Sequence, residues 1–207
     1  MTPLHVDAAC IVVVKPAGLP AVPGRGEHLQ DCVATRVQAQ FVDALVVHRL
    51  DMATSGLMLF ARGADAQRAL SRAFERREVH KRYVAVVHGR IDPAEGEIDL
   101  PLRADWPNRP RQMVDAAHGK PSLTRYRVQA HDAVANTSRV MLEPVTGRTH
   151  QLRVHLLAIG HPILGDMLYA PAAVQAVADR LLLHAKSLTF VHPVDGQTLC
   201  VSHDPPF

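Results

Sequence analysis

Three short segments of the sequence concentrate side chains that could take part in catalysis. The first, residues 48–56, reads His-Arg-Leu-Asp-Met-Ala-Thr-Ser-Gly and contains one carboxylate, Asp51. A carboxylate in a loop between two apolar strands can act as a nucleophile or a base, because the strands hold the loop rigid. Alternatively, Asp51 only caps a turn, and the segment by itself leaves both interpretations open.

The second segment, residues 147–155, reads Gly-Arg-Thr-His-Gln-Leu-Arg-Val-His and is expected to enter a helix. Arg148 and Arg153 could bind an anion there, since a helix N-terminus also attracts negative charge. They could equally be solvated. His150 and His155 are five positions apart, which does not place both on one helical face. Because the sequence also lacks an H-E-x-x-H motif, a zinc protease site is not expected.

The third segment, residues 81–89, places Tyr83 on an expected strand beside Lys81 and Arg82. A tyrosine in such a position can stack on a nucleic-acid base, although most strand tyrosines only pack against a core.

Of the 23 basic residues, 19 are arginines, which bind phosphates through two hydrogen bonds and stack on bases. The net charge of +3 is small, so on composition alone a GC-rich genome explains the arginine content better than a nucleic-acid partner does.

The elements that must position these segments follow from apolar patterning. Residues 92–122 show little periodicity and are expected to form a long functional or mobile loop. Because strands arrive in adjacent pairs more often than in strict β-α-β order, we expect an α+β fold with a mixed, largely antiparallel sheet flanked by helices and loops. Asp31 and Asp65 are the expected caps of the first two helices. The expected helices are residues 33–41, 65–74, 149–159 and 172–183. The expected strands are residues 10–14, 45–50, 57–61, 83–87, 122–129, 138–145, 186–191 and 198–202.

Length and composition narrow the class of protein. A chain of 207 residues predicts a single domain over residues 1–207. The three cysteines are scattered without a C-x-x-C motif, so we expect neither a disulfide framework nor a metal site. No run of 18 apolar residues and no leader sequence is visible, so we expect a cytoplasmic protein without a membrane partner.

Taken together, the segments resemble the signature sequences of the RluA-type pseudouridine synthases. The resemblance covers nearly the whole chain and implies the pseudouridine synthase catalytic fold, without the S4-like RNA-binding domain that many relatives carry before it. Residues 105–110, Asp-Trp-Pro-Asn-Arg-Pro, resemble the small dual-specificity members of the family. The segments that carry the resemblance are residues 15–18, 48–56, 81–85, 147–155, 160–166 and 181–185.

The resemblance implies a reaction that needs no metal and no cofactor. A uridine in RNA is detached from its ribose at N1, rotated, and rejoined through C5. By this resemblance Asp51 is the nucleophile, Tyr83 stacks on the target base and is a candidate for proton removal, and Arg153 pairs with the aspartate. An arginine partner would keep the carboxylate ionised and oriented, as a nucleophile requires.

Structured RNA is the partner that the resemblance implies: U32 in the anticodon stem-loop of tRNA and U746 in a hairpin of 23S rRNA, bound by a monomer. The target base must be flipped out of its stack, and Arg49 resembles the residue that enters the gap. Arg68, Arg72 and Arg76 are four residues apart and are expected to form a stripe on one face of a helix. The simplest explanation of this arrangement is that the face is exposed to solvent. Further candidates for RNA contact are His48, Arg148, Arg109 and Arg111.

Two alternatives to this enzyme belong to other functional classes. A non-catalytic RNA-binding module of the same fold is disfavoured because Asp51, Tyr83 and Arg153 occur together. A carboxylate-dependent hydrolase acting on a nucleotide would need a metal site or a second positioned acid, and the sequence shows neither.

Overall fold

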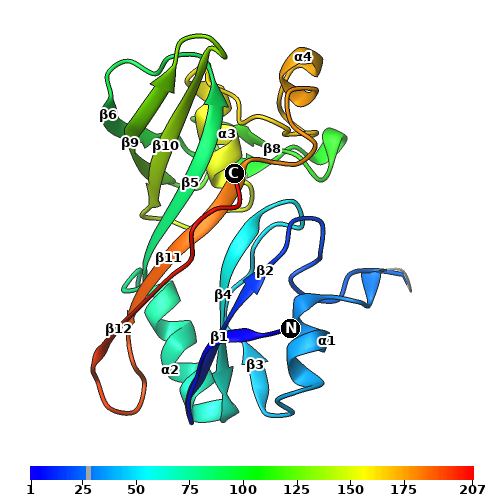
Figure 1. Ribbon diagram of the computed structural model, residues 1–207, viewed down its shortest axis with the longest axis vertical. Coiled ribbons are helices and arrows are strands. Elements are labelled where there is room, and N and C mark those ends of the chain that lie inside the picture. The colour runs from blue at the N-terminus through cyan, green and yellow to red at the C-terminus, as the bar shows by residue number, and fades with distance from the viewer. Residues whose placement is uncertain (27–28) are drawn as a thin grey trace. The chain divides into compact units, whose positions relative to one another are not determined.

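The computed structural model describes residues 1–26 and 29–207, and the chain divides into two compact units. Unit 1 comprises Met1–Lys81 and Ala185–Pro206, and unit 2 comprises Arg82–His184 with Phe207. The chain passes between the units inside strand β5 and again inside strand β11 (Figure 1). Unit 1 is therefore assembled from two stretches that are far apart in the sequence.

Unit 1 is a sheet with two helices. Its strands follow the order β1-β2-β4-β11, with β12 paired to β11 and β3 paired to β4. The pairings β1–β2, β2–β4, β3–β4 and β11–β12 are antiparallel. Helix α2 contacts β3 and β4, and α1 contacts β3. The elements are β1 (Pro3–Val6), β2 (Cys10–Lys15), α1 (Val33–Gln38), β3 (Ala44–Val46), β4 (Ser55–Arg62), α2 (Gly63–Glu75), β11 (Leu183–Val191) and β12 (Thr198–Ser202).

Strand β4 lies at the centre of the core of unit 1. Leu57 and Leu59 of β4 pack against Leu70 of α2 and against Leu188 and Phe190 of β11, and all five side chains are buried. Burying five side chains of this size stabilises the unit by roughly 1.5–3 kcal/mol each. This core fixes the start of β4 and therefore the loop that precedes it.

The helices of unit 1 form where the sequence predicts them, but their caps differ. Cys32 caps α1 by accepting a hydrogen bond from the Thr35 main-chain N–H at 3.4 Å. The expected cap, Asp31, instead pairs with Arg36 at 2.6 Å. The expected cap of α2, Asp65, lies inside its first turn, where a negative charge interacts favourably with the helix dipole.

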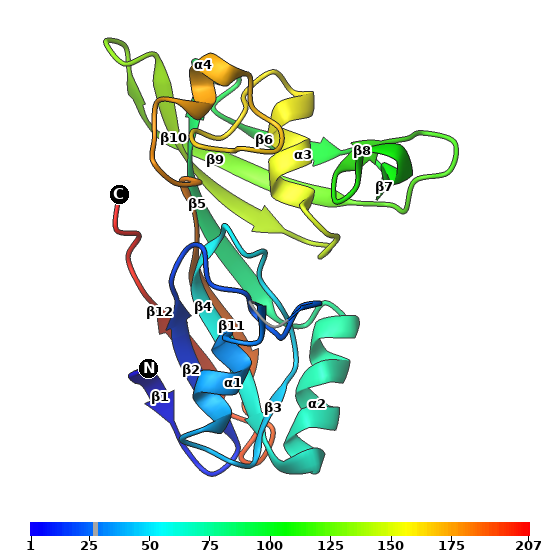
Figure 2. The ribbon, with the colours of Figure 1, turned by 90° about the vertical axis from the view of Figure 1, so that its right-hand side faces the viewer.

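Unit 2 contains the strands β5-β10-β9-β6, which are neighbours in that order in the ten-stranded main sheet and pair antiparallel, and a separate two-stranded sheet, β7–β8. Helix α3 contacts β8 and β10, and it lies beside β8 in Figure 2. The elements are β5 (His80–His88), β6 (Glu95–Asp99), β7 (Leu102–Ala104), the 3-10 helix η2 (Trp106–Asn108), β8 (Gln112–Val114), β9 (Leu123–Asp132), β10 (Thr137–Pro144), α3 (Gln151–Ala158) and α4 (Ala172–Gln175).

Two predictions about unit 2 are wrong. Residues 92–122 are not one long loop, because they form β6, β7, η2 and β8, and strands of three to five residues are too short to show a period. Residues 172–183 are not one helix: α4 has four residues, and the chain then becomes extended. The Leu182 carbonyl accepts from the Val86 N–H at 3.1 Å, while the Leu182 N–H donates to Leu164 at 3.0 Å.

The α+β class with a largely antiparallel sheet is confirmed, since both units are built on antiparallel strands with few helices. The expected strand at residues 45–50 ends at Val46, where the loop that carries Asp51 begins. Across the described part of the chain, every helix is too short or too polar to reach from one side of a lipid bilayer to the other.

Candidate functional site

Asp51 lies in the loop of unit 1 between β3 and β4. The Thr54 N–H donates to the Asp51 main-chain carbonyl at 3.1 Å and closes a tight turn. Asp51 is half-buried, whereas Thr54 and Ser55 are buried. Gly56 follows at a φ of +118°, and a Cβ at this position would lie 2.4 Å from the main chain of Ala185. The Thr-Ser-Gly part of the motif therefore lets β4 start in close contact with β11.

Lys15 holds the other side of this loop and is fully buried. Its ammonium group donates to the carbonyls of Pro16 at 2.8 Å, Leu19 at 2.6 Å and Met52 at 2.7 Å. Three carbonyls match the three protons of the group, as a buried ammonium requires. The Gly18 N–H also donates to the Met52 carbonyl at 2.9 Å. The residue after Asp51 is thus tied to the 15–19 turn from two directions.

His48 and Arg49, on the same loop, have different environments. The Leu59 N–H donates to His48 Nε2 at 2.9 Å, and the His48 ring stacks on Phe74 with centroids 4.5 Å apart. Burial, followed by the positive charge of Lys81, lowers the pKa of His48 to about 3. His48 is therefore neutral near pH 7 and braces the loop, while Arg49 is exposed. Contact of either residue with RNA stays a prediction.

Arg68 and Arg72 lie on the exposed face of α2, as their spacing predicts. Arg68 forms an ion pair with Asp65, and Arg72 Nε donates to the Arg68 carbonyl at 3.3 Å. Both side chains are accessible to a polyanion, and a solvated face remains the alternative.

In unit 2, Arg153 on α3 is buried with 4% of its side chain exposed, so it is not a solvated arginine. Its Nε and Nη2 donate to the two carboxylate oxygens of Asp166 at 2.8 and 2.6 Å. The main-chain N–H groups of Leu168 and Tyr169 donate to Asp166 Oδ1 at 3.0 and 3.2 Å. Asp166 therefore fixes the plane of the guanidinium group. Asp166 is not among the predicted site residues, although it is the last residue of segment 160–166, which resembles the pseudouridine synthase sequences.

Several charged and polar groups of unit 2 lie in contact with Tyr169. Its ring centroid lies 5.0 Å from the guanidinium carbon of Arg153 and 5.5 Å from that of Arg111. Its hydroxyl accepts from the Gln112 N–H at 2.8 Å and lies 2.7 Å from His150 Nδ1. Arg111 and Arg153 were predicted from different segments, and the structure brings both to one aromatic ring. Tyr169 itself was not predicted, because a lone tyrosine carries no motif.

The start of α3 is a buried hydrogen-bond network. Gln151 Oε1 accepts from the Thr146 hydroxyl at 2.7 Å and from the Arg148 N–H at 3.0 Å. His155 Nδ1 lies 3.0 Å from the Thr124 hydroxyl, and burial lowers the pKa of His155. Gln151 and His155 therefore hold the helix in place. The Arg148 side chain reaches a main-chain carbonyl at 3.4 Å and stays a predicted RNA contact.

The two remaining predicted residues of unit 2 lie on different elements. Arg109 stacks on Trp106, with its guanidinium carbon 4.9 Å from the ring centroid, and 65% of Trp106 is exposed. Tyr83 is half-buried on β5, opposite Leu142 of β10. Tyr83 and Arg153 both belong to unit 2 and Asp51 to unit 1, and the pairing of Arg153 with Asp51 stays a prediction.

Comparisons with known proteins identify the family. A family model described as RNA pseudouridylate synthase matches residues 9–158. The chain is 54% identical over 196 residues to the dual-specificity RNA pseudouridine synthase RluA of Escherichia coli K12, covering 95% of this chain and 89% of that one. It is 48% identical over 204 residues to the RluA of Pasteurella multocida, covering 99% and 93% of the two chains.

Solved structures give the same result. Human RNA pseudouridylate synthase domain containing 1 matches with a TM-score of 0.83 and 30% identity, covering 100% of this chain and 84% of that chain. Human RNA pseudouridylate synthase domain containing 4 matches with a TM-score of 0.78 and 25% identity, covering 99% and 88%. The resemblance noted in the sequence is confirmed, and the chain belongs to the RNA pseudouridine synthase family, isomerases that convert uridine to pseudouridine in RNA.

Proposed function

We propose that this enzyme modifies two RNAs, converting U32 of tRNA anticodon stem-loops and U746 of a 23S rRNA hairpin to pseudouridine without a cofactor. The observation that carries the proposal is the 54% identity, across 95% of this chain, with an enzyme named for dual specificity. In the same proposal, residues 1–207 act as a single catalytic domain, as a monomer, in the cytoplasm.

Asp51 is the proposed nucleophile. Its support is the rigidity of its loop, since Lys15 and Gly18 both hold the carbonyl of Met52. A fixed carboxylate loses little freedom when it reacts. The isomerisation breaks the N1–C1′ bond and forms a C5–C1′ bond, while C5 loses one proton and N1 gains one, so atoms and electrons balance without another reactant.

Tyr83 and Arg153 are the other two proposed catalytic residues. The phenol ring of Tyr83 supplies a stacking surface for the flipped uracil, and its hydroxyl is the candidate group for removing the C5 proton. The Arg153 guanidinium supplies positive charge in one fixed orientation, because Asp166 holds its Nε and Nη2.

Arginines that are exposed or half-buried are the proposed contacts to the RNA backbone. Arg49 fills the gap that the flipped base leaves, because a planar guanidinium can stack where a base was. His48, being neutral, contributes to binding by holding Arg49 in place rather than by its own charge. The other proposed RNA-binding residues are Arg148, Arg109, Arg111, Arg68 and Arg72.

The test is to incubate the protein with transcribed tRNA and with a 23S rRNA fragment, in the presence of a chelator, and to map pseudouridine at single-nucleotide resolution. We expect one modified uridine in each RNA. Binding of both RNAs without any pseudouridine would instead support a non-catalytic binding module. Release of free uracil would support a hydrolase, and modification of only one RNA would contradict dual specificity.

A further inference from the structure

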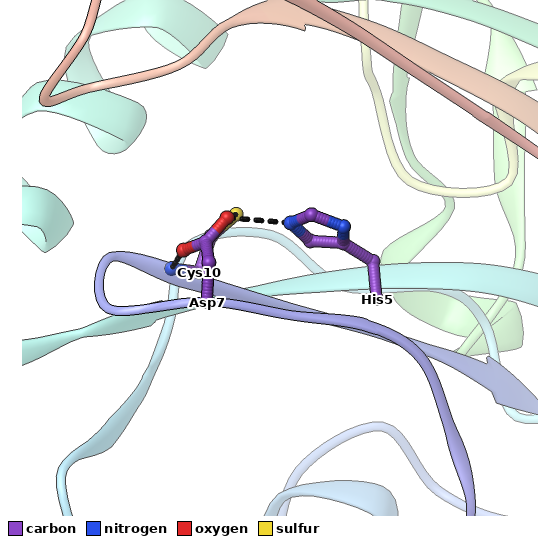
Figure 3. Close-up of side chains that lie close together, drawn as sticks. All are labelled: His5, Asp7 and Cys10. Carbon is purple, nitrogen blue, oxygen red and sulfur yellow. Dashed lines mark hydrogen bonds and ion pairs between the residues drawn. The ribbon is translucent and has the colours of Figure 1, made fainter.

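A second cluster of reactive side chains lies in unit 1, on the hairpin between β1 and β2. One ligand atom each from His5, Asp7 and Cys10 lies within 4.8 Å of the others (Figure 3). His5 comes from β1, Asp7 from the turn and Cys10 from the first position of β2. The three side chains offer an imidazole nitrogen, a carboxylate oxygen and a thiol sulfur, which are the ligand types of zinc sites.

A fourth potential ligand comes from the other end of the sequence. His192 follows β11, and its Nε2 lies 3.3 Å from Asp7 Oδ2. This nitrogen is buried and has no hydrogen-bond partner among the described residues. A buried nitrogen that makes no hydrogen bond is uncommon in proteins and costs free energy. It is therefore an independent indication that a ligand belongs at this position.

The orientation of His192 is fixed from its opposite side. His192 Nδ1 lies 2.9 Å from Asp195 Oδ1 and 3.4 Å from the Asp195 main-chain N–H. In the longer contact Nδ1 accepts from the Asp195 main-chain N–H, whereas a proton on Nδ1 would be donated to the Asp195 carboxylate instead. With the proton on Nδ1, Nε2 keeps a lone pair for an ion at a position 3.3 Å from Asp7 Oδ2. Carboxylates that hold the second nitrogen of a histidine in this way orient metal-binding histidines.

The distances from Asp7 Oδ2 agree with a tetrahedral ion, but His192 lies outside the group of three ligand atoms within 4.8 Å of one another, so its ring must move closer to His5 and Cys10 to complete the site. Zinc bonds of about 2.0–2.1 Å to nitrogen and about 2.3 Å to sulfur place neighbouring ligand atoms roughly 3.3–3.6 Å apart. The observed distances to Asp7 Oδ2 are 3.3 Å from His192 Nε2 and 3.4 Å from Cys10 Sγ. His5 Nε2 lies 2.5 Å from the same oxygen in a short hydrogen bond and would move by about 0.8 Å when an ion comes between the two atoms.

The turn already holds Asp7 in the orientation that such a site needs. Asp7 Oδ1 accepts from the N–H groups of Ala9 at 2.7 Å and Cys10 at 2.8 Å. The main chain thus occupies one carboxylate oxygen, and the other faces the cluster.

We propose that His5, Asp7, Cys10 and His192 form a four-coordinate zinc site that fastens the β1–β2 hairpin to the turn between β11 and β12. The Asp7 carboxylate and the Cys10 thiolate balance the two charges of the ion. Binding releases the Cys10 thiol proton to solvent, and the His5 proton moves from Nε2 to Nδ1, so that Nε2 can bind the ion.

The proposed ion is separate from the proposed chemistry at Asp51. Cys10 begins β2 and Lys15, which holds the Asp51 loop, ends it. Five strand steps separate these residues by about 17 Å. The ion is therefore a structural element of unit 1.

The test uses the full chain, stripped of metal by a chelator and kept reduced. Zinc is titrated against a competing chromophoric chelator, and Co²⁺ is then used as a spectroscopic substitute. We expect one ion per chain and a thiolate-to-cobalt charge-transfer band. Cys10→Ser should abolish the band. His192→Ala should weaken zinc binding at least 100-fold, and Asp195→Asn by about 10–100-fold.

Two matched controls separate this site from adventitious binding. Cys200→Ser removes an exposed thiol and His118→Ala an exposed imidazole, and both should bind zinc as the wild type does. Absence of the charge-transfer band in the wild type would overturn the proposal, as would equal affinities of His192→Ala and His118→Ala. If circular dichroism shows that Cys10→Ser is unfolded, the zinc affinity of Asp195→Asn tests the proposal instead. This substitution changes an exposed residue that is not a ligand.

Discussion

The carboxylate of Asp51 is the only acidic group between β3 and β4. Asp51→Asn keeps the size of the side chain but removes its nucleophilic charge, so we expect the single-turnover rate of pseudouridine formation to fall by at least ~1,000-fold. The free energy of unfolding should change by less than about 1 kcal/mol, because the turn is closed by the main chain. Glu75→Gln, an exposed carboxylate of unit 1, is the control and should keep full activity.

The phenol hydroxyl of Tyr83 is tested by Tyr83→Phe. The ring remains, so stacking worth ~1–3 kcal/mol per base should be retained and the Kd for RNA should stay within twofold. The single-turnover rate should fall severely, because the hydroxyl is the only group removed. Tyr126→Phe, which alters a half-buried tyrosine of β9, should leave the rate unchanged. If both variants match the wild type, Tyr83 is only a stacking platform.

His48 gives the stability of the protein a pH dependence with a defined sign. Its pKa is lowered from 6.5 to about 3, so the unfolded chain binds the proton more readily. Stability from this group is present above pH 6.5 and is lost as the pH falls toward 3. Between pH 6.5 and pH 5 we expect a loss of about 1.5 kcal/mol in the free energy of unfolding.

Denaturant unfolding of the wild type and of His48→Gln at the two pH values measures this loss. Glutamine can accept the hydrogen bond from Leu59 but does not titrate. The variant should therefore lose about 1.5 kcal/mol less than the wild type over that interval. Equal losses in the two proteins would show that His48 is not the titrating group.

At the scale of elements, the sequence predicts best where apolar periodicity is long. The strand at residues 57–61 and the helix at residues 65–74 are confirmed because the core of unit 1 requires their buried faces. The helix at residues 172–183 is wrong, since apolar side chains such as Leu181 and Leu183 are buried on an extended segment that main-chain hydrogen bonds hold. Apolar periodicity indicates which side chains are buried. It does not indicate the main-chain hydrogen bonds that determine whether a segment is a helix or a strand.

The same limit applies to the candidate site. Asp51, Tyr83 and Arg153 could be selected because each lies in a dense polar motif. Asp166 and Lys15 stand among apolar and turn residues, and their roles depend on partners distant in the sequence, such as Met52 for Lys15. A single sequence does not reveal such pairings.

The Lys15 contact with the Asp51 loop is tested by Lys15→Met, which keeps the length of the side chain. Three carbonyls lose the ammonium as a donor at a fully buried side chain, so we expect the free energy of unfolding to fall by at least about 3 kcal/mol. The catalytic rate should also fall, because only the Gly18 N–H would then hold the Met52 carbonyl. Lys186→Met removes an ammonium group paired with an exposed aspartate and should cost less than about 1 kcal/mol. An equal effect of both substitutions would contradict the positioning role of Lys15.

At the scale of the whole molecule, RNA affinity should depend strongly on salt despite a net charge of only +3. If arginines contact ~4–6 phosphates, the slope of log affinity against log salt should be roughly −3 to −5. Filter binding of tRNA over a range of salt concentrations measures this slope. The double variant Arg68→Gln, Arg72→Gln should reduce it by about 1–2 if the stripe on α2 binds phosphate. The control Arg36→Gln should leave it unchanged, and an unchanged slope in the double variant would show that the stripe is solvated.

The chain crosses from unit 1 to unit 2 and later returns to unit 1, so unit 1 cannot be complete until the last residues of the chain have been synthesised. Residues 82–184, which form almost all of unit 2, are synthesised before most of β11 and all of β12 exist. Until residues 185–206 emerge, β4 lacks its partner β11, and an unpaired strand edge invites association with other chains. A nascent chain stalled after residue 184 therefore presents the apolar β4 as a recognition signal for chaperones. Once residues 185–206 leave the ribosome, β11 pairs with β4 and the apolar side chains of β4 are buried in the core of unit 1.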